Sequence, residues 1–427
     1  MAQPPAVMAQ FELRTSSTNQ RRIILLTSIG HALCHIAELA YAAVIPAVMA
    51  EFAITADQAA LLAVPGFVLF GVGAVPAGFW SDRRGSQVAM RAYFALVAAA
   101  SLAVFFSRSP WSLGLGLTLL GAAISVYHPV GLAMLSHGCT NRGRAMGING
   151  VCGSLGVATG PAMGIFIISY FYDWRLTYAV IAALSIVGFA FAMLVRIDLP
   201  RFTARTVHSE DSRSSSSFAV LAILFVAMLV GGFNYRCMTT ALPTFISTRT
   251  AAELTADDAQ TESPNRSATH EERSTDVKGK GSSLLVFVIF ALGGIGQLTG
   301  GLLADRFRPA TLYCVAIGVS IPLALLIDRA PGELGLVAAG ILAVFVFAEQ
   351  PLENTMIAEA TPAKWRSTVY GLKFILAFGV ASFGVYVAGL VWRFHGLARV
   401  FDVYAIGAVA MVLFAAIYAL KQRTFKQ

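Results

Sequence analysis

The sequence predicts an all-α membrane protein with twelve transmembrane helices in two six-helix bundles, and three observations support this. Apolar residues make up 57% of the 427 residues and charged residues only 13%, whereas soluble domains average about 45–50% and about 25%. Apolar segments long enough to span a bilayer recur along the chain. A short Gly–Asp–Arg loop sequence occurs twice, at corresponding places in the two halves, as a repeat of two bundles predicts.

Twelve apolar segments are separated by polar stretches, and most reach the roughly 20 residues that a spanning helix needs. They lie at residues 23–48, 58–80, 89–107, 111–136, 145–171, 176–195, 218–247, 283–304, 310–327, 334–358, 368–392 and 401–420. Each is expected to be helical, because a backbone segment inside lipid must satisfy its own hydrogen bonds.

Lys and Arg residues set the expected orientation, because short cytoplasmic loops carry an excess of them. With the N-terminus in the cytoplasm, nineteen Lys and Arg residues fall on the cytoplasmic side and ten outside. Five of those ten lie in one long polar stretch, where the rule has least force. We therefore expect both termini in the cytoplasm.

Two long polar stretches divide the chain. Residues 196–217, rich in Arg and Ser, are interpreted as a flexible cytoplasmic linker between an N-terminal bundle (1–195) and a C-terminal bundle (218–427). Residues 248–282 contain seven acidic and five basic residues and no apolar periodicity. They are expected to form a disordered external loop.

The repeated loop follows the second and the eighth apolar segments. Its residues are Gly78, Asp82, Arg83 and Gly85 in the first copy, and Gly301, Asp305 and Arg306 in the second. The leading glycine allows close helix approach at the membrane edge. The Asp and Arg charges can latch one conformation and separate in another. The loops are therefore candidate conformational gates, and for a single copy a plain positive-inside loop is the alternative.

The fifth apolar segment is rich in glycine and contains one proline. The residues are Gly147, Gly156, Gly160, Pro161 and Gly164. Glycine weakens a helix in water, but small residues four apart let two helix backbones approach closely in a membrane. Ordinary small-residue packing is one interpretation of this pattern. On that basis we expect Gly160 to accept nothing larger than a methyl group.

These motifs resemble those of the major facilitator superfamily, a family of twelve-helix secondary transporters. The two loops resemble the family's loop signature, with Ser86 and Gln87 where the first copy usually has basic residues. The glycine–proline segment resembles the family's antiporter motif, with Ile165 in place of the final glycine. The resemblance implies two bundles around a central cavity, and the antiporter motif implies export.

A narrower resemblance, to the fosmidomycin-resistance-type efflux branch, rests on three short stretches. These are the aromatic-His-Pro sequence at 127–129, the Gly-Pro sequence at 160–161 and the Gly-His sequence at 30–31. His35 stands where members of that branch have an acidic residue. We expect an integral protein of a bacterial cytoplasmic (inner) membrane.

Polar and ionisable residues inside the apolar segments are costly to bury and are the candidates for a substrate and proton pathway. They are His31, His35, Glu38, His128, Asn234, Tyr235, Arg236, Glu349 and Glu353. Lys373 lies near the start of the eleventh segment. It is expected to extend toward the membrane surface, so we leave it outside the site.

His31, His35 and Glu38 recur at helical spacing and share one helix face. Three interpretations remain open: a proton or substrate site on the cavity, a transition-metal site formed by two imidazoles one turn apart, or a structural hydrogen-bonded cluster. A Cys- or Met-rich entry path is absent, and Arg236 would repel a bare metal ion. Both observations favour protons and an organic substrate, with no bound metal.

Arg236 is interpreted as a partner for an anionic substrate or a carboxylate, and a purely structural ion pair is the alternative. Glu349 and Glu353 lie one turn apart and repel each other when both are ionised, which suits a proton carrier. Permanent pairing of Glu349 with Arg236 is the structural alternative.

The sequence thus favours proton-coupled efflux of a small organic molecule by alternating access, with transition-metal or metal-chelate transport as the alternative. No ATP-binding GxxxxGK[ST] sequence and no catalytic triad are found, so an enzyme is not expected. The charges lie in clusters between apolar segments, which argues against nucleic acid. The expected partners are a small-molecule substrate, protons and the lipid bilayer, with no cofactor and a monomeric chain.

Overall fold

The apolar segments are helical, as the hydrogen-bonding demand of a bilayer interior requires. The computed structural model describes residues 16–140, 142–198, 218–260, 268–304, 306–331, 333–361, 369 and 372–426. This part of the chain contains no β-strand. It has eleven helices that are long and apolar enough to cross a membrane, and one pair bent by 45° that can supply a twelfth span. The predicted all-α membrane class is confirmed.

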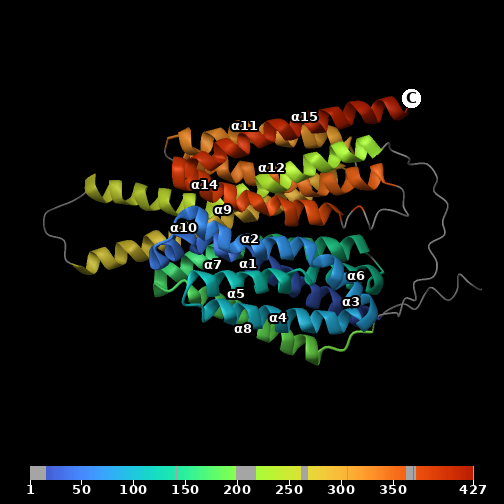
Figure 1. Cartoon of the computed structure of the whole chain (residues 1–427), viewed down its shortest axis with the longest axis horizontal. Helices are drawn as coiled ribbons and strands as arrows, with labels where there is room; N and C mark the ends of the chain where they lie inside the picture. Colours follow the sequence, from blue (N-terminus) through green and yellow to red (C-terminus); the bar gives the residue numbers. More distant parts are fainter. Residues whose placement is uncertain are drawn as a thin grey trace, which may run out of the picture.

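The chain folds as two helical bundles that lie side by side (Figure 1). The helices of the first are α1 (Ser17–Phe52), α2 (Ala56–Val72), α3 (Ala74–Arg84), α4 (Ser86–Phe105), α5 (Pro110–Ile124), α6 (Tyr127–Gly138), α7 (Arg142–Phe171) and α8 (Arg175–Leu194). Those of the second are α9 (Phe218–Gln260), α10 (Ala268–Ala304), α11 (Pro309–Arg329), α12 (Leu334–Ala360), α14 (Phe383–His395) and α15 (Val400–Lys426). Buried apolar side chains form two clusters. One lies within the first bundle, and the other is centred on the second and takes in parts of α1 and α7 where the bundles meet.

We name the two ends of the molecule by the first helix. The α1-start face holds the beginning of α1, the turn between α3 and α4, and the end of α15. The α1-end face holds the end of α1 and the beginning of α2. Because the spans alternate in direction, every second connection lies on the same face.

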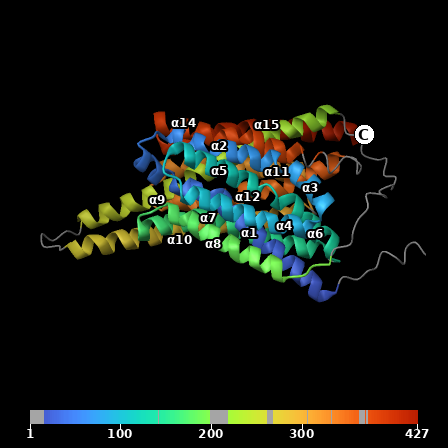
Figure 2. The same cartoon turned by 60° about the horizontal axis from the view of Figure 1, so that its bottom comes forward.

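Helices α9 and α10 run beyond the other helices at the α1-end face, as Figures 1 and 2 both show. The expectation of a disordered loop over 248–282 is therefore wrong for its described parts, 248–260 and 268–282, which are helical. Residues 251–260 are rich in Ala with Glu, Leu and Gln, all good helix formers. Extending an existing helix also needs no new nucleus. Residues 261–267, and 199–217 of the expected linker, lie outside the described residues.

One span is interrupted near the middle of the molecule. Ser125 and Val126 separate α5 from α6. Pro129 has no N–H to donate to the carbonyl of Ser125, which favours a break at this point. His128 consequently lies in the first turn of α6. Pro161, by contrast, lies inside α7 without interrupting it.

Helix α7 packs on α1 through its glycines. A Cβ atom on Gly156 would overlap the α1 backbone, and one on Gly160 would lie 2.8 Å from the carbonyl oxygen of Ile36. Gly164 is less tight, with 3.1 Å to a side-chain atom of α1, and Gly147 faces open space. Backbone atoms cannot move aside as a flexible side chain does, so even a methyl group at Gly160 requires the two helices to shift. The expectation that Gly160 accepts a side chain as large as a methyl group is therefore wrong.

Candidate functional site

A cavity of about 310 Å³ lies between the two bundles. Its polar lining residues are His31, His35, His128, Asn149, Ser154, Tyr235, Gln297, Glu349, Gln350, Glu353, Asn354 and Lys373. These positions lie at the middle of their helices or nearer the α1-start face. The cavity therefore extends from the centre of the molecule toward that face. Its volume is at the small end of the range for small-molecule sites.

The two bundles contact each other directly toward the α1-end face. Nη1 of Arg393 in α14 lies 3.2 Å from Oδ2 of Asp57 in α2. The Oγ of Ser283 in α10 donates to the carbonyl oxygen of Ala162 in α7 at 2.7 Å. The two bundles thus contact each other on the α1-end side of the central cavity, and the cavity separates them on the α1-start side.

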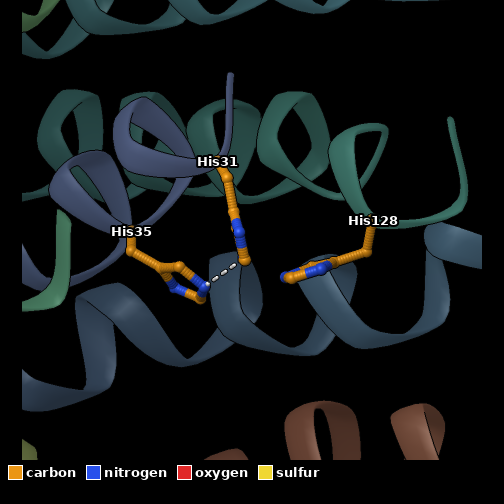
Figure 3. A group of neighbouring side chains, drawn as sticks. All are labelled: His31, His35 and His128. Carbon is orange, nitrogen blue, oxygen red and sulfur yellow. Dashed lines mark hydrogen bonds between the residues drawn. The ribbon is translucent and has the colours of Figure 1, made fainter. Parts of the chain in front are cut away.

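Three histidines converge on the cavity wall of the first bundle. The Nε2 atoms of His31 and His35 lie 3.2 Å apart. The ring of His128 lies with its centroid 5.3 Å from that of His31 and 5.5 Å from that of His35. Figure 3 shows the rings from α1 and α6 pointing toward a common space. The Nε2 of His128 is buried and has no hydrogen-bond partner among the described residues.

Glu38 connects the histidines to the second bundle. Its Oε2 lies 2.6 Å from Nδ1 of His35, and its Oε1 accepts from Nη1 of Arg236 in α9 at 2.7 Å. The side chains of Glu38 and Arg236 are each 1% exposed. The guanidinium of Arg236 also lies 4.3 Å from the ring centroid of Phe67. Arg236 thus pairs with a carboxylate group, and that group belongs to Glu38 rather than to Glu349.

A second buried ion pair lies within the second bundle. Nζ of Lys373 is 2.9 Å from Oε2 of Glu353, whose Oε1 accepts from the hydroxyl of Tyr313 at 2.9 Å. Lys373 was wrongly left outside the site. It is only 3% exposed, because Glu353 and the Oδ1 of Asn354, 2.8 Å away, hold its ammonium group inside. Glu349 lies on the same wall, and its Oε1 is buried without a hydrogen-bond partner in the described part of the chain.

Two neighbouring residues of α9 behave differently. Tyr235 lines the cavity and its ring packs edge-on against Phe347, with centroids 5.8 Å apart. Asn234 does not line the cavity, because its Nδ2 donates to the carbonyl oxygen of Tyr404 in α15 at 3.0 Å. Successive helical residues point about 100° apart, so Asn234 faces the interior of the second bundle. The prediction that Asn234 lines the substrate and proton pathway is therefore wrong.

The two loop motifs lie at the α1-start face. The first occupies the end of α3 and the following turn, with Gly78, Asp82, Arg83 and Gly85. The second ends α10, with Gly301 inside the helix and Arg306 exposed in the turn, and Asp305 lies outside the described residues. Gly85 adopts a φ of 93°, which favours glycine. Asp82 is exposed, and no ion pair or hydrogen bond joins it to another described residue.

Sequence reasoning missed several residues that complete the wall. Asn149 offers its carbonyl oxygen to His31, and Ser154 donates to Oε1 of Gln297 across the bundle contact at 2.6 Å. Phe374 and Phe378 stack on His128, with centroids 5.8 and 6.4 Å away. Phe374 directly precedes a π-helical turn, Ile375–Gly379, and Phe378 lies within it; such turns often mark functional sites. Gln297 could have been predicted from the sequence, because it is a polar residue in an apolar segment.

Two bundles that enclose a cavity lined by polar and aromatic side chains, and that are joined on one side of it, have the architecture of an alternating-access transporter. The sequence profile described as the Major Facilitator Superfamily matches residues 27–259, more than half of the chain. The chain therefore belongs to this superfamily. It is a secondary transporter of small molecules, an integral multi-pass membrane protein and not an enzyme.

Solved structures show the same fold. A bacterial homolog to the human lysosomal transporter Spinster, inward-facing and unoccupied, has a TM-score of 0.71 and 16% identity, covering 96% of this chain and 98% of that chain. The same homolog in an occupied conformation gives 0.70 and 15%, over 96% and 98%. A mutant of the nucleoside transporter NupG gives 0.69 and 12%, over 94% and 99%. No curated protein sequence matches the chain. These likenesses concern the fold and place the chain in no particular efflux branch.

Proposed function

We propose that this transporter exports a small organic molecule in exchange for protons, and that Glu349 carries the transported proton. The observation that carries the proposal is that the acidic residues in and next to the cavity differ in whether they have a cationic partner. Glu38 and Glu353 each have a cationic partner within 3 Å, at 2.7 and 2.9 Å. One oxygen of Glu349 is buried with no hydrogen-bond partner among the described residues.

An ionised carboxylate in that position would have one oxygen buried without a hydrogen bond and no cationic partner among the described residues. The effective penalty for burying such a group is several kcal/mol, and a bound proton removes it. When the cavity changes sides, the surroundings of Glu349 change and the proton can leave toward the other compartment. A carboxyl group that moves between these environments is what proton coupling needs.

The wall of the cavity suggests the class of cargo. Phe347, Phe374 and Phe378 supply aromatic surface, and hydrogen-bonding groups from both bundles surround it. Arg236 is occupied by Glu38 and lies outside this cavity. The cavity therefore gives no support to a specific preference for anions. A small organic molecule with an apolar or aromatic part fits this lining best.

The proposed direction of transport and the orientation of the chain in the membrane rest on the sequence. The α7 pattern resembles the antiporter motif of exporters, and the excess of Lys and Arg assigns the α1-start face to the cytoplasm. With that assignment the cavity extends toward the cytoplasm. A cysteine placed at Ser267 should react with an impermeant thiol reagent from outside the cell, and one at Ser215 should not. The reverse labelling pattern would overturn the orientation.

Antiport can be tested in everted bacterial membrane vesicles whose interior is acidified by respiration. Compounds are first selected by screening a deletion strain and an overexpressing strain for growth against a panel of toxic molecules. An exported compound should then dissipate part of the pH gradient in wild-type vesicles, read with a gradient-sensitive fluorescent dye. Glu349→Gln should abolish this response.

The control is Glu359→Gln, which makes the same change at an exposed position of the same helix and should leave the response intact. Two results would contradict the proposal. One is a full response in Glu349→Gln vesicles, and the other is movement of the compound in the same direction as the protons.

A further inference from the structure

The three histidines of the first bundle form a compact set of nitrogen donors. The ligand atoms of His31, His35 and His128 all lie within 4.8 Å of one another (Figure 3). Two come from adjacent turns of α1, and the third comes from the first turn of α6 after the break in that span. Tyr127 stacks on His31 with ring centroids 4.9 Å apart and an interplanar angle of 18°, which fixes the orientation of that imidazole.

The spacing of the two α1 nitrogens fits a shared metal ion. Zinc–nitrogen bonds of about 2.0–2.1 Å in a tetrahedral site place two ligand atoms about 3.3 Å apart. The Nε2 atoms of His31 and His35 are 3.2 Å apart. The buried Nε2 of His128, which has no partner among the described residues, can close the remaining gap by a side-chain rotation.

The outer nitrogens of both α1 histidines are already oriented. Nδ1 of His31 lies 2.8 Å from the carbonyl oxygen of Asn149, and Nδ1 of His35 lies 2.6 Å from a carboxylate oxygen of Glu38. A histidine that binds a metal usually donates its other N–H to a carbonyl or a carboxylate, which turns the free nitrogen toward the ion. His31 makes this contact with a carbonyl oxygen and His35 makes it with a carboxylate oxygen. The two contacts direct both Nε2 atoms to one point.

The electrostatic objection raised by the sequence does not hold in the folded protein. Arg236 was expected to repel a bare cation, but its charge is paired with Glu38 at 2.7 Å. The three imidazoles also line the cavity. An ion bound to them would keep a fourth tetrahedral position for water or for a donor atom of a cargo molecule.

We infer that His31, His35 and His128 bind a divalent transition-metal ion of the zinc class on the cavity wall. Neutral imidazole suits this class of ion. The ligand is the ion alone or the ion held in a small chelate that fills the fourth position. Glu38 is a positioning residue that acts through His35. The site goes beyond the proposed function, which rests on Glu349 in the other bundle.

The test is metal binding by the purified full-length chain, with any histidine tag removed. Protein in detergent is equilibrated with Zn²⁺, freed of unbound ion by desalting, and its metal content is measured by mass spectrometry. Wild type should retain about one ion per chain. His31→Asn, His35→Asn and His128→Asn should each weaken binding by at least about 100-fold, because each removes a ligand rather than an outer partner. His395→Asn, a change at an exposed histidine of α14, should match wild type.

Two further measurements keep the inference falsifiable if a histidine variant fails to fold. Co²⁺ bound to the wild type should give the intense visible absorption of a four-coordinate ion, and weak six-coordinate bands would overturn the site. Folded Glu38→Gln protein should keep that spectrum and weaken binding by at least about 10-fold, because the change loosens the orientation of His35 and leaves the charge of Arg236 unpaired. Absence of a retained ion in wild type, or equal retention by folded variants of all three histidines, would also refute the inference.

Discussion

Neutralising Glu38 while leaving Arg236 in place should strongly destabilise the protein. In Glu38→Gln the side chain of Arg236, which is 1% exposed, remains buried with no anionic partner among the described residues. Its Nε and Nη2 atoms already lack hydrogen-bond partners among the described residues. The lost attraction is therefore not replaced by another contact of Arg236.

The size of the effect follows from the geometry. Two unit charges 2.7 Å apart attract each other by about 6 kcal/mol at an effective dielectric of about 20. Desolvation of both groups offsets much of this, so the net worth of the pair is small. Removing one partner, however, keeps the desolvation cost of the other charge. Glu38→Gln should then lower the free energy of unfolding by about 3–5 kcal/mol.

The measurement is equilibrium unfolding of the purified protein in mixed micelles, followed by near-ultraviolet circular dichroism, as a double-mutant cycle. Arg236→Met alone should also be destabilising, because it leaves the Glu38 charge buried. The double variant Glu38→Gln/Arg236→Met should recover at least half of the summed loss, since no unpaired charge remains. Glu359→Gln, at an exposed site, should change little. A loss below about 1 kcal/mol for Glu38→Gln, or strictly additive losses in the double variant, would refute the reasoning.

Three other variants test separate parts of the structure. Glu349→Gln should lose transport driven by a proton gradient but keep exchange of substrate down its own gradient, measured in proteoliposomes; unchanged pH dependence would remove its assigned role. Gly160→Leu should abolish transport at normal membrane abundance, because its Cβ alone meets the α1 backbone at 2.8 Å and overpacking costs about 1–3 kcal/mol or more. Gly147→Leu, at an open position, is the matched control, and equal transport by the two variants would show that this close contact is dispensable. Arg393→Glu places a like charge opposite Asp57 and should shift the bundles a few-fold toward opening at the α1-end face, read as thiol accessibility, because a pair this exposed is worth less than about 1 kcal/mol. Adding Asp57→Lys should restore the wild-type accessibility, and failure to do so would mean that the pair does not hold this side closed.

The sequence by itself determined the fold class and the approximate position of every span. A backbone inside a bilayer must form its hydrogen bonds locally, so the length of an apolar segment is enough to predict a helix. The same reasoning failed for 248–260 and 268–282, where polarity was taken as disorder although Ala, Glu and Leu after residue 250 favour continuation of α9. The sequence also supplied most candidate site residues, because ionisable groups are rare in lipid and therefore stand out.

Only the tertiary structure decided how these residues combine. It paired Glu38 with Arg236, joined Lys373 to Glu353, and left Oε1 of Glu349 buried without a hydrogen-bond partner among the described residues. It turned Asn234 away from the cavity and brought His128 to the α1 histidines. Hydropathy reports that a helix crosses the membrane, but contacts between side chains depend on its rotation and depth. Those are set by close packing, such as Gly160 against the α1 backbone, and this packing involves residues more than a hundred positions apart in the chain.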